Sequence, residues 1–144
     1  MSISLIIKSN PGIIQLLDDA VSSFDKEGWI DCLIQIKVDC FDVSLHSHFY
    51  KPDFDAFKES IEEFYGDKRS TIKLVAIEDY LLLEGKIQDN GLIFWKCTIR
   101  SINNLSNVLY FGFETDESIL HNLSVALYDI LILKSNMADY PNNT

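Results

Sequence analysis

The pair His46 and His48 has the spacing that side chains on a β-strand would need to bind a metal ion or transfer a proton together. Residues i and i+2 of a strand point to the same face, so two imidazoles at this spacing could hold a metal ion or move a proton. Asp42 and Ser44 have the same parity and would share that face. The chain has one further histidine, His121, and two histidines do not make a metal site. We therefore predict a solvated strand face and no metal site, and we leave contact with a partner open.

Adjacent carboxylates are the other groups suited to chemistry, and they occur at Asp18-Asp19, Glu62-Glu63, Glu78-Asp79 and Asp116-Glu117. General acid–base catalysis needs one carboxylate in an apolar cleft, where its pKa is raised. These pairs fall in predicted turns, at a predicted helix start or on a polar helix face, where water keeps both groups ionised. The sequence also lacks a glycine-rich phosphate loop, a nucleophile elbow and a metalloprotease motif. We predict a protein that is not an enzyme, with no catalytic residue and no cofactor.

The three cysteines, Cys32, Cys40 and Cys97, are odd in number and none has C-x-x-C spacing. This excludes a zinc knuckle, a redox motif and a closed disulfide framework. Cys32 and Cys40 alternate with polar residues, which predicts small hydrophobes on a strand. No basic region precedes the apolar N-terminal stretch, and no apolar run approaches about 18 residues. We expect a cytoplasmic protein that does not insert into a membrane.

The charge of the chain is strongly acidic and unevenly distributed. Its 22 acidic and 12 basic residues give a net charge of −10, which disfavours nucleic acid because the phosphate backbone would be repelled. The acidity falls on the N-terminus and the two predicted helices. On the first helix, Asp55, Glu59, Glu62 and Glu63 lie within about 100° of arc, opposite the apolar stripe. This face is either a solvated surface or the partner-binding surface for a basic protein, whose approach the negative potential would speed.

The elements that must position these groups are mostly strands. Residues 2–8 and 12–18 are predicted as two short strands around the turn tripeptide Asn10-Pro11-Gly12. Apolar residues recur at every second position in residues 30–40, and a phase slip at Cys40-Phe41 predicts a tight turn or a bulge before the next strand. Four further strands are predicted at 71–77, 80–88, 92–100 and 108–114. Asp89-Asn90-Gly91 is typical of a type I′ hairpin turn.

Two helices complete the pattern. The first starts with Asp53 as N-cap after Pro52, spans about three turns and buries Phe54, Phe57, Ile61 and Phe64. The second starts with Thr115 as N-cap and stays apolar around much of its circumference, so it should be largely buried. The predicted fold is α+β, an antiparallel sheet of about seven or eight strands with a short inserted helix and a long C-terminal helix packed on the sheet. We expect one domain over residues 1–134 and a flexible tail over 135–144.

Three stretches of the sequence match a known pattern. A long strand, Trp29–Val38, leads toward a short helix at Phe54–Ile61; a hairpin runs from Tyr80 to Gly91; and an aromatic strand enters a helix start over Phe111–Leu120. In these stretches the sequence resembles the WapI-like family of bacterial immunity proteins, which are small, acidic, cytoplasmic α+β proteins of polymorphic toxin systems.

The resemblance implies a stoichiometric inhibitor in contact-dependent inhibition. Such a protein would bind a cognate toxin domain, often a basic nuclease, and neutralise it through a protein–protein interface, as a monomer or weak homodimer. Two alternatives stay open. One is a small-molecule-binding or enzymatic domain with a pocket on the concave face of the sheet, lined by His46, Tyr80, Trp95 and Tyr110. The other is a structural domain that pairs through an exposed edge strand.

Overall fold

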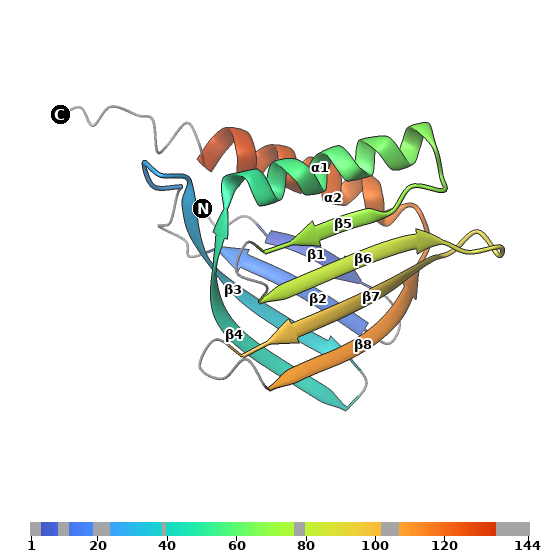
Figure 1. The fold of residues 1–144 in the computed structure, drawn as a ribbon, viewed down its shortest axis with the longest axis horizontal. Helices are drawn as coiled ribbons and strands as arrows, with labels where there is room; N and C mark the ends of the chain where they lie inside the picture. The colour runs from blue at the N-terminus through green and yellow to red at the C-terminus, as the bar shows by residue number, and fades with distance from the viewer. Residues whose placement is uncertain are drawn as a thin grey trace.

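A computed structural model of the chain shows two antiparallel sheets and two helices (Figure 1). The structure describes residues 4–8, 12–18, 24–38, 40–76, 80–101 and 107–134. The first sheet and its helix consist of β1 (Ser4–Lys8), β2 (Gly12–Asp18), β3 (Trp29–Val38), β4 (Phe41–Tyr50) and α1 (Lys51–Gly66). The second set consists of β5 (Ile72–Val75), β6 (Leu81–Ile87), β7 (Ile93–Arg100), β8 (Val108–Thr115) and α2 (Ile119–Asp129), which continues into a π-helical turn, Ile130–Lys134.

The α+β class and the antiparallel pairing are confirmed, whereas the single sheet is wrong. The strands form two four-stranded meanders, β1-β2-β3-β4 and β5-β6-β7-β8, each followed by a helix. The same strand–strand–strand–strand–helix unit thus occurs twice among the described residues. A period-two pattern shows that a strand is half-buried, but it does not show to which sheet the strand belongs.

The lengths of the two helices are the reverse of the prediction. α1 has 16 residues and α2 has 11, so the long C-terminal helix is wrong. The apolar pattern does run on to Lys134, but from Ile130 the backbone forms a π-helical turn. A π turn bonds i to i+5 and ends the regular α-helical ladder, even where the side chains still suit a helix.

Both predicted N-caps are also wrong. α1 begins at Lys51, and Asp53 sits at its third position, where a carboxylate oxygen accepts a hydrogen bond from the Tyr50 backbone N–H at 3.2 Å. A carboxylate at the third position accepts from the N–H of the N-cap residue, whereas a carboxylate at the N-cap would accept from an N–H inside the first turn. Thr115 is the last residue of β8, and Ser118 precedes α2 instead.

Several turns follow the sequence closely. β3 and β4 are joined by a tight turn, with Val38 and Phe41 as register partners, so the phase slip marks a turn and not a bulge. Cys40 is exposed in that turn, which corrects its expected place on a strand, while Cys32 is buried as predicted. The β6–β7 hairpin turns at Asp89-Asn90-Gly91 as predicted, but it is not the predicted type I′ turn around Asn90-Gly91. The Gly91 N–H donates to the Gln88 carbonyl at 3.0 Å, so Asp89 and Asn90 are the central residues and Gly91, with φ of 85°, follows them.

The core lies between the inner faces of the two sheets and beneath the helices. α1 packs on β5 and α2 packs on β1, so the helices close one end of the sandwich (Figure 1). The predicted stripe of α1 is buried. α2 is less buried than predicted, because it buries Leu120, Leu123 and Leu127 but exposes Val125 and Tyr128. At the other end β4 and β8 are the last strands of their sheets, and no ladder joins them in the described structure. We call the gap between β4 and β8 the open seam.

The predicted tail, residues 135–144, lies outside the described residues. Within the described part of the chain, neither helix has the length and apolar character that crossing a membrane requires.

Candidate functional site

The four predicted partner-binding residues, Asp55, Glu59, Glu62 and Glu63, are all exposed on α1. They lie away from the buried stripe, because that stripe faces β5 and the core. We call them the acidic face. One cation lies among them: Lys58 Nζ is 2.7 Å from Glu62 Oε1. The pKa of Lys58 is raised by its hydrogen bond with Glu62 and by the charges of Glu62, Asp55 and Glu59.

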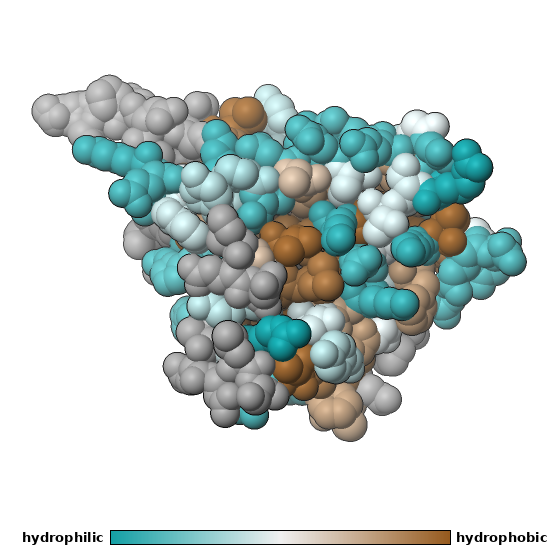
Figure 2. Space-filling view, viewed as in Figure 1, coloured by the Kyte–Doolittle hydropathy of each residue, from teal (hydrophilic) through white to brown (hydrophobic). Residues whose placement is uncertain are grey.

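The other three carboxylates of the acidic face have no ion pair with any described residue. They are presented on a helix whose opposite side is anchored by Phe54, Phe57, Ile61 and Phe64, each no more than 1% exposed. Figure 2 shows hydrophilic side chains gathered along the edge where α1 lies, with hydrophobic surface over the strands beneath. The acidic face is therefore a rigid array of negative charge open to solvent.

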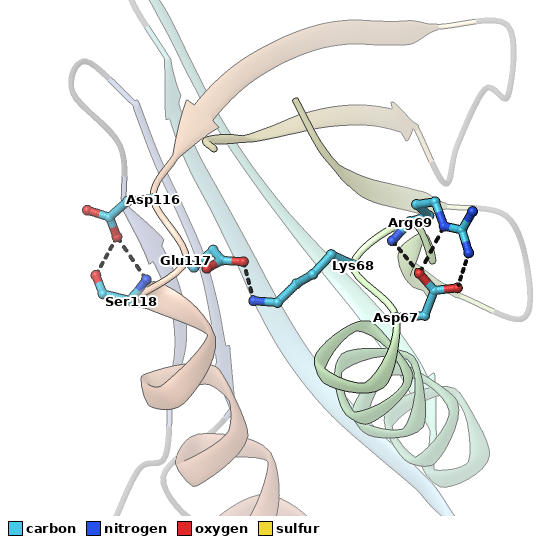
Figure 3. Close-up of polar contacts among 6 residues, drawn as sticks. All are labelled: Asp67, Lys68, Arg69, Asp116, Glu117 and Ser118. Atoms are coloured by element: carbon cyan, nitrogen blue, oxygen red, sulfur yellow. Dashed lines mark hydrogen bonds and ion pairs between the residues drawn. The ribbon is translucent and has the colours of Figure 1, made fainter. Parts of the chain in front are cut away.

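Beyond the C-terminal end of α1, an ion pair links the turn after α1 to the turn before α2 (Figure 3). Lys68, in the turn after α1, places its Nζ 2.5 Å from Glu117 Oε1, in the turn before α2. The same ammonium lies 5.0 Å from the Phe64 ring centroid. Beside it, Arg69 pairs with Asp67, whose pKa is lowered by hydrogen bonds from the Arg69 backbone and side chain. The basic side chains at this end are thus already engaged with acids.

A hollow of the described surface lies in the open seam. It has a volume of about 680 Å³ and is lined by Val43, Ser44, Leu45, His46, Ile99, Ser101, Asn107, Val108 and Leu109. Its walls come from β4 on one side and from β7, β8 and the ends of the loop joining them on the other. The cleft is therefore a gap between two sheets, not a pocket on the concave face of one sheet.

Of the four residues predicted to line a pocket, His46 alone lines this cleft. Trp95 is fully buried in the core, where its Nε1 donates a hydrogen bond to Thr115 Oγ1 at 2.8 Å. Tyr110 is 70% exposed, and Tyr80 is not among the lining residues. Alternation along β8 explains the outcome for Tyr110, because even-numbered residues point away from the sandwich.

The two histidines share the outer face of β4, as their spacing predicts. Both are exposed, and Asp31, the register partner of His48, lies across the ladder with Oδ1 against His48 Nδ1. His46 stands opposite Leu33. Among the described residues no three His, Cys, Asp or Glu side chains gather closely enough to hold a metal ion.

One buried polar group was not anticipated from the sequence. Ser47, 2% exposed on the inner face of β4, has a side-chain oxygen that finds no hydrogen-bond partner among the described residues. It follows Leu45 on that face and stands opposite Cys32 in the ladder. The alternation of β4 does mark Ser47 as inward-facing, but only the structure shows that the hydroxyl is unpaired.

A scan against protein-family models, a search of curated proteins and a search of solved structures each found no match to this chain. The resemblance to the WapI-like family therefore stays a prediction.

Proposed function

We propose that this chain is an immunity protein, which binds a cognate bacterial toxin domain and neutralises it through a protein–protein interface. The observation that carries the proposal is the acidic face of α1, where carboxylates stand exposed on a helix held rigidly by its buried stripe. No cofactor is needed, because the inhibitor acts by occupying a surface of the toxin.

The electrostatics favour a basic partner. Toxins that act on nucleic acids carry positive surfaces, since their substrates are polyanions, and a chain of net charge −10 complements such a surface. With 16 residues, α1 is about 24 Å long, so its face can supply much of the roughly 800 Å² per partner that a standard interface buries. The negative potential would raise the association rate more than it would slow dissociation.

The first test is capture of the partner. The tagged full-length chain is used to isolate bound proteins from its native host in moderate salt, and these are identified by mass spectrometry. A stoichiometric fragment from the C-terminal end of a larger secreted protein, whose toxicity the chain suppresses on co-expression, would support the proposal. A captured protein that is not toxic, or whose toxicity the chain leaves intact, would contradict it.

Charge reversal then tests the face itself. The double variant Glu59→Lys with Glu63→Lys changes two acids that have no ion pair with any described residue and leaves the Lys58–Glu62 pair in place. The matched control, Asp42→Lys with Asp89→Lys, makes the same change in net charge at exposed sites away from α1.

We expect the α1 variant to slow association with the captured toxin at least tenfold in low salt, and the control to slow it much less. Equal effects of the two variants would show that net charge alone matters and that the acidic face is not the interface.

A further inference from the structure

The open seam contains a cleft that the proposed function does not use. The helices close the sandwich where β1 and β5 lie, but nothing in the described structure closes it between β4 and β8 (Figure 1). The resulting hollow of about 680 Å³ falls within the range of roughly 300–1,000 Å³ that is typical of small-molecule sites.

The lining of this cleft is divided between an apolar floor and a polar rim. Val43 and Leu45 are half-buried on the inner face of β4 and pack against the core, and Ile99 and Leu109 face them from β7 and β8. Four polar residues border the floor: Ser44, His46, Ser101 and Asn107. Such a lining complements a molecule with an aliphatic body and a hydrogen-bonding head.

Charge restricts the class of ligand further. None of the nine lining residues is an Asp, Glu, Lys or Arg. A charged head would leave water for a site with no counter-charge, which is unfavourable, and an anion would also meet the net charge of −10 of the whole chain. The lining therefore favours an uncharged head group, such as an alcohol or an amide.

The length of the cleft favours a small molecule over a peptide strand as its ligand. Four consecutive residues of β4 line it, which is about 13 Å of strand, while β8 contributes only Val108 and Leu109. A strand added to an edge forms a ladder along its own length, usually over about five or six residues. The lining on β8 is too short for that, so the cleft fits a compact ligand better than an extended peptide.

We propose that the cleft in the open seam binds an uncharged small amphiphile, with its aliphatic chain on the Val43–Leu45 floor and its polar head at the rim. The proposal is independent of the immunity function, because the acidic face of α1 takes no part in it.

The test is an NMR titration of the full-length, ¹⁵N-labelled chain with three probes of one chain length: octanol, octanoate and octylammonium. Octanol should shift backbone amides at the lining positions, saturate, and bind at least tenfold more tightly than either ion. Tighter binding of octanoate or octylammonium would overturn the assignment of an uncharged ligand. Unsaturable shifts spread over exposed apolar side chains elsewhere, such as Val125 and Tyr128 on α2, would overturn the site.

A short uncharged β-strand peptide serves as the competing probe. If it binds, shifts amides along the whole of β4 and β8, and octanol does not bind, the seam accepts a strand and the small-molecule proposal is wrong.

A pair of filling variants adds a second measurement. Val43→Phe should weaken octanol binding at least tenfold, because the larger side chain occupies the floor. Val38→Phe is the matched control, since Val38 is also half-buried on the inner face of the same sheet but does not line the cleft. If both variants bind octanol as the natural chain does, the proposed site is wrong. If Val43→Phe does not fold, the titration of the natural chain still decides the proposal.

Discussion

Loss of the hydrogen bond between Trp95 and Thr115 should lower the unfolding free energy of this fold. The indole of Trp95 is fully buried, and its Nε1 donates to Thr115 Oγ1 at 2.8 Å at the point where β8 ends. Thr115→Val keeps the shape of the side chain and its suitability for a strand but removes the acceptor. The indole N–H is then left buried without a partner, which costs about 1–3 kcal/mol of unfolding free energy.

The measurement is urea unfolding followed by far-ultraviolet circular dichroism. With a slope of about 2 kcal/mol/M, a loss of about 2 kcal/mol lowers the midpoint by about 1 M. Two controls separate the hydrogen bond from other effects. Thr115→Ser keeps the hydroxyl and loses one methyl group, which costs about 0.8 kcal/mol. Thr98→Val makes the same substitution on the half-exposed outer face of β7, where a change within about 0.5 kcal/mol is expected.

Equal stability of Thr115→Val and Thr115→Ser would contradict this prediction, since the unpaired indole would then carry no measurable penalty. A shift in slope without a shift in midpoint would instead indicate a change in the unfolded state.

Three further predictions follow from single contacts. Burial raises the pKa of the Cys97 thiol from 9.0 to about 12, so the unfolded state loses this proton first and the unfolding free energy falls as pH rises between those values. Cys97→Ala should lessen that fall in alkaline unfolding curves. A thiol reagent should label Cys40 alone until the protein unfolds, because Cys32 and Cys97 are buried. Gly85→Ala would place a Cβ 2.8 Å from two ring carbons of the buried Trp95, and we expect a loss of about 1–3 kcal/mol in urea unfolding. Lys68→Met removes an exposed ion pair but keeps the aliphatic stem, so thermal unfolding should report a loss of no more than about 1 kcal/mol.

Local patterns predicted much of the fold because they depend on neighbours in the sequence. The alternation of β3 and the 3-4-3 spacing of α1 each expose one face to the core, and burial follows from that geometry. Helix starts were harder, because a residue type can stabilise the first turn from more than one position. Asp53 was predicted as the N-cap, yet the same carboxylate satisfies the Tyr50 N–H from inside the helix.

The same distinction between local pattern and tertiary arrangement applies to the candidate sites. The acidic face could be predicted because its four residues lie within three turns of one helix. The cleft could not, because it depends on how β4 lies relative to β8, and these strands belong to different sheets. Trp95 was expected to line a pocket on the basis of its type, but its place opposite Gly85 in the ladder puts the ring in the core.

The two ends of the sandwich differ because of the order of the elements. Each meander ends in a strand that enters a helix, and the helices lie across the end where β1 and β5 are found (Figure 1). The acids belong to the outward side of α1, so the negative surface lies at the closed end. The seam between β4 and β8 receives no helix, and its lining carries no formal charge. A basic protein bound on α1 and an uncharged ligand bound in the cleft would therefore occupy separate surfaces, and neither would need to displace the other.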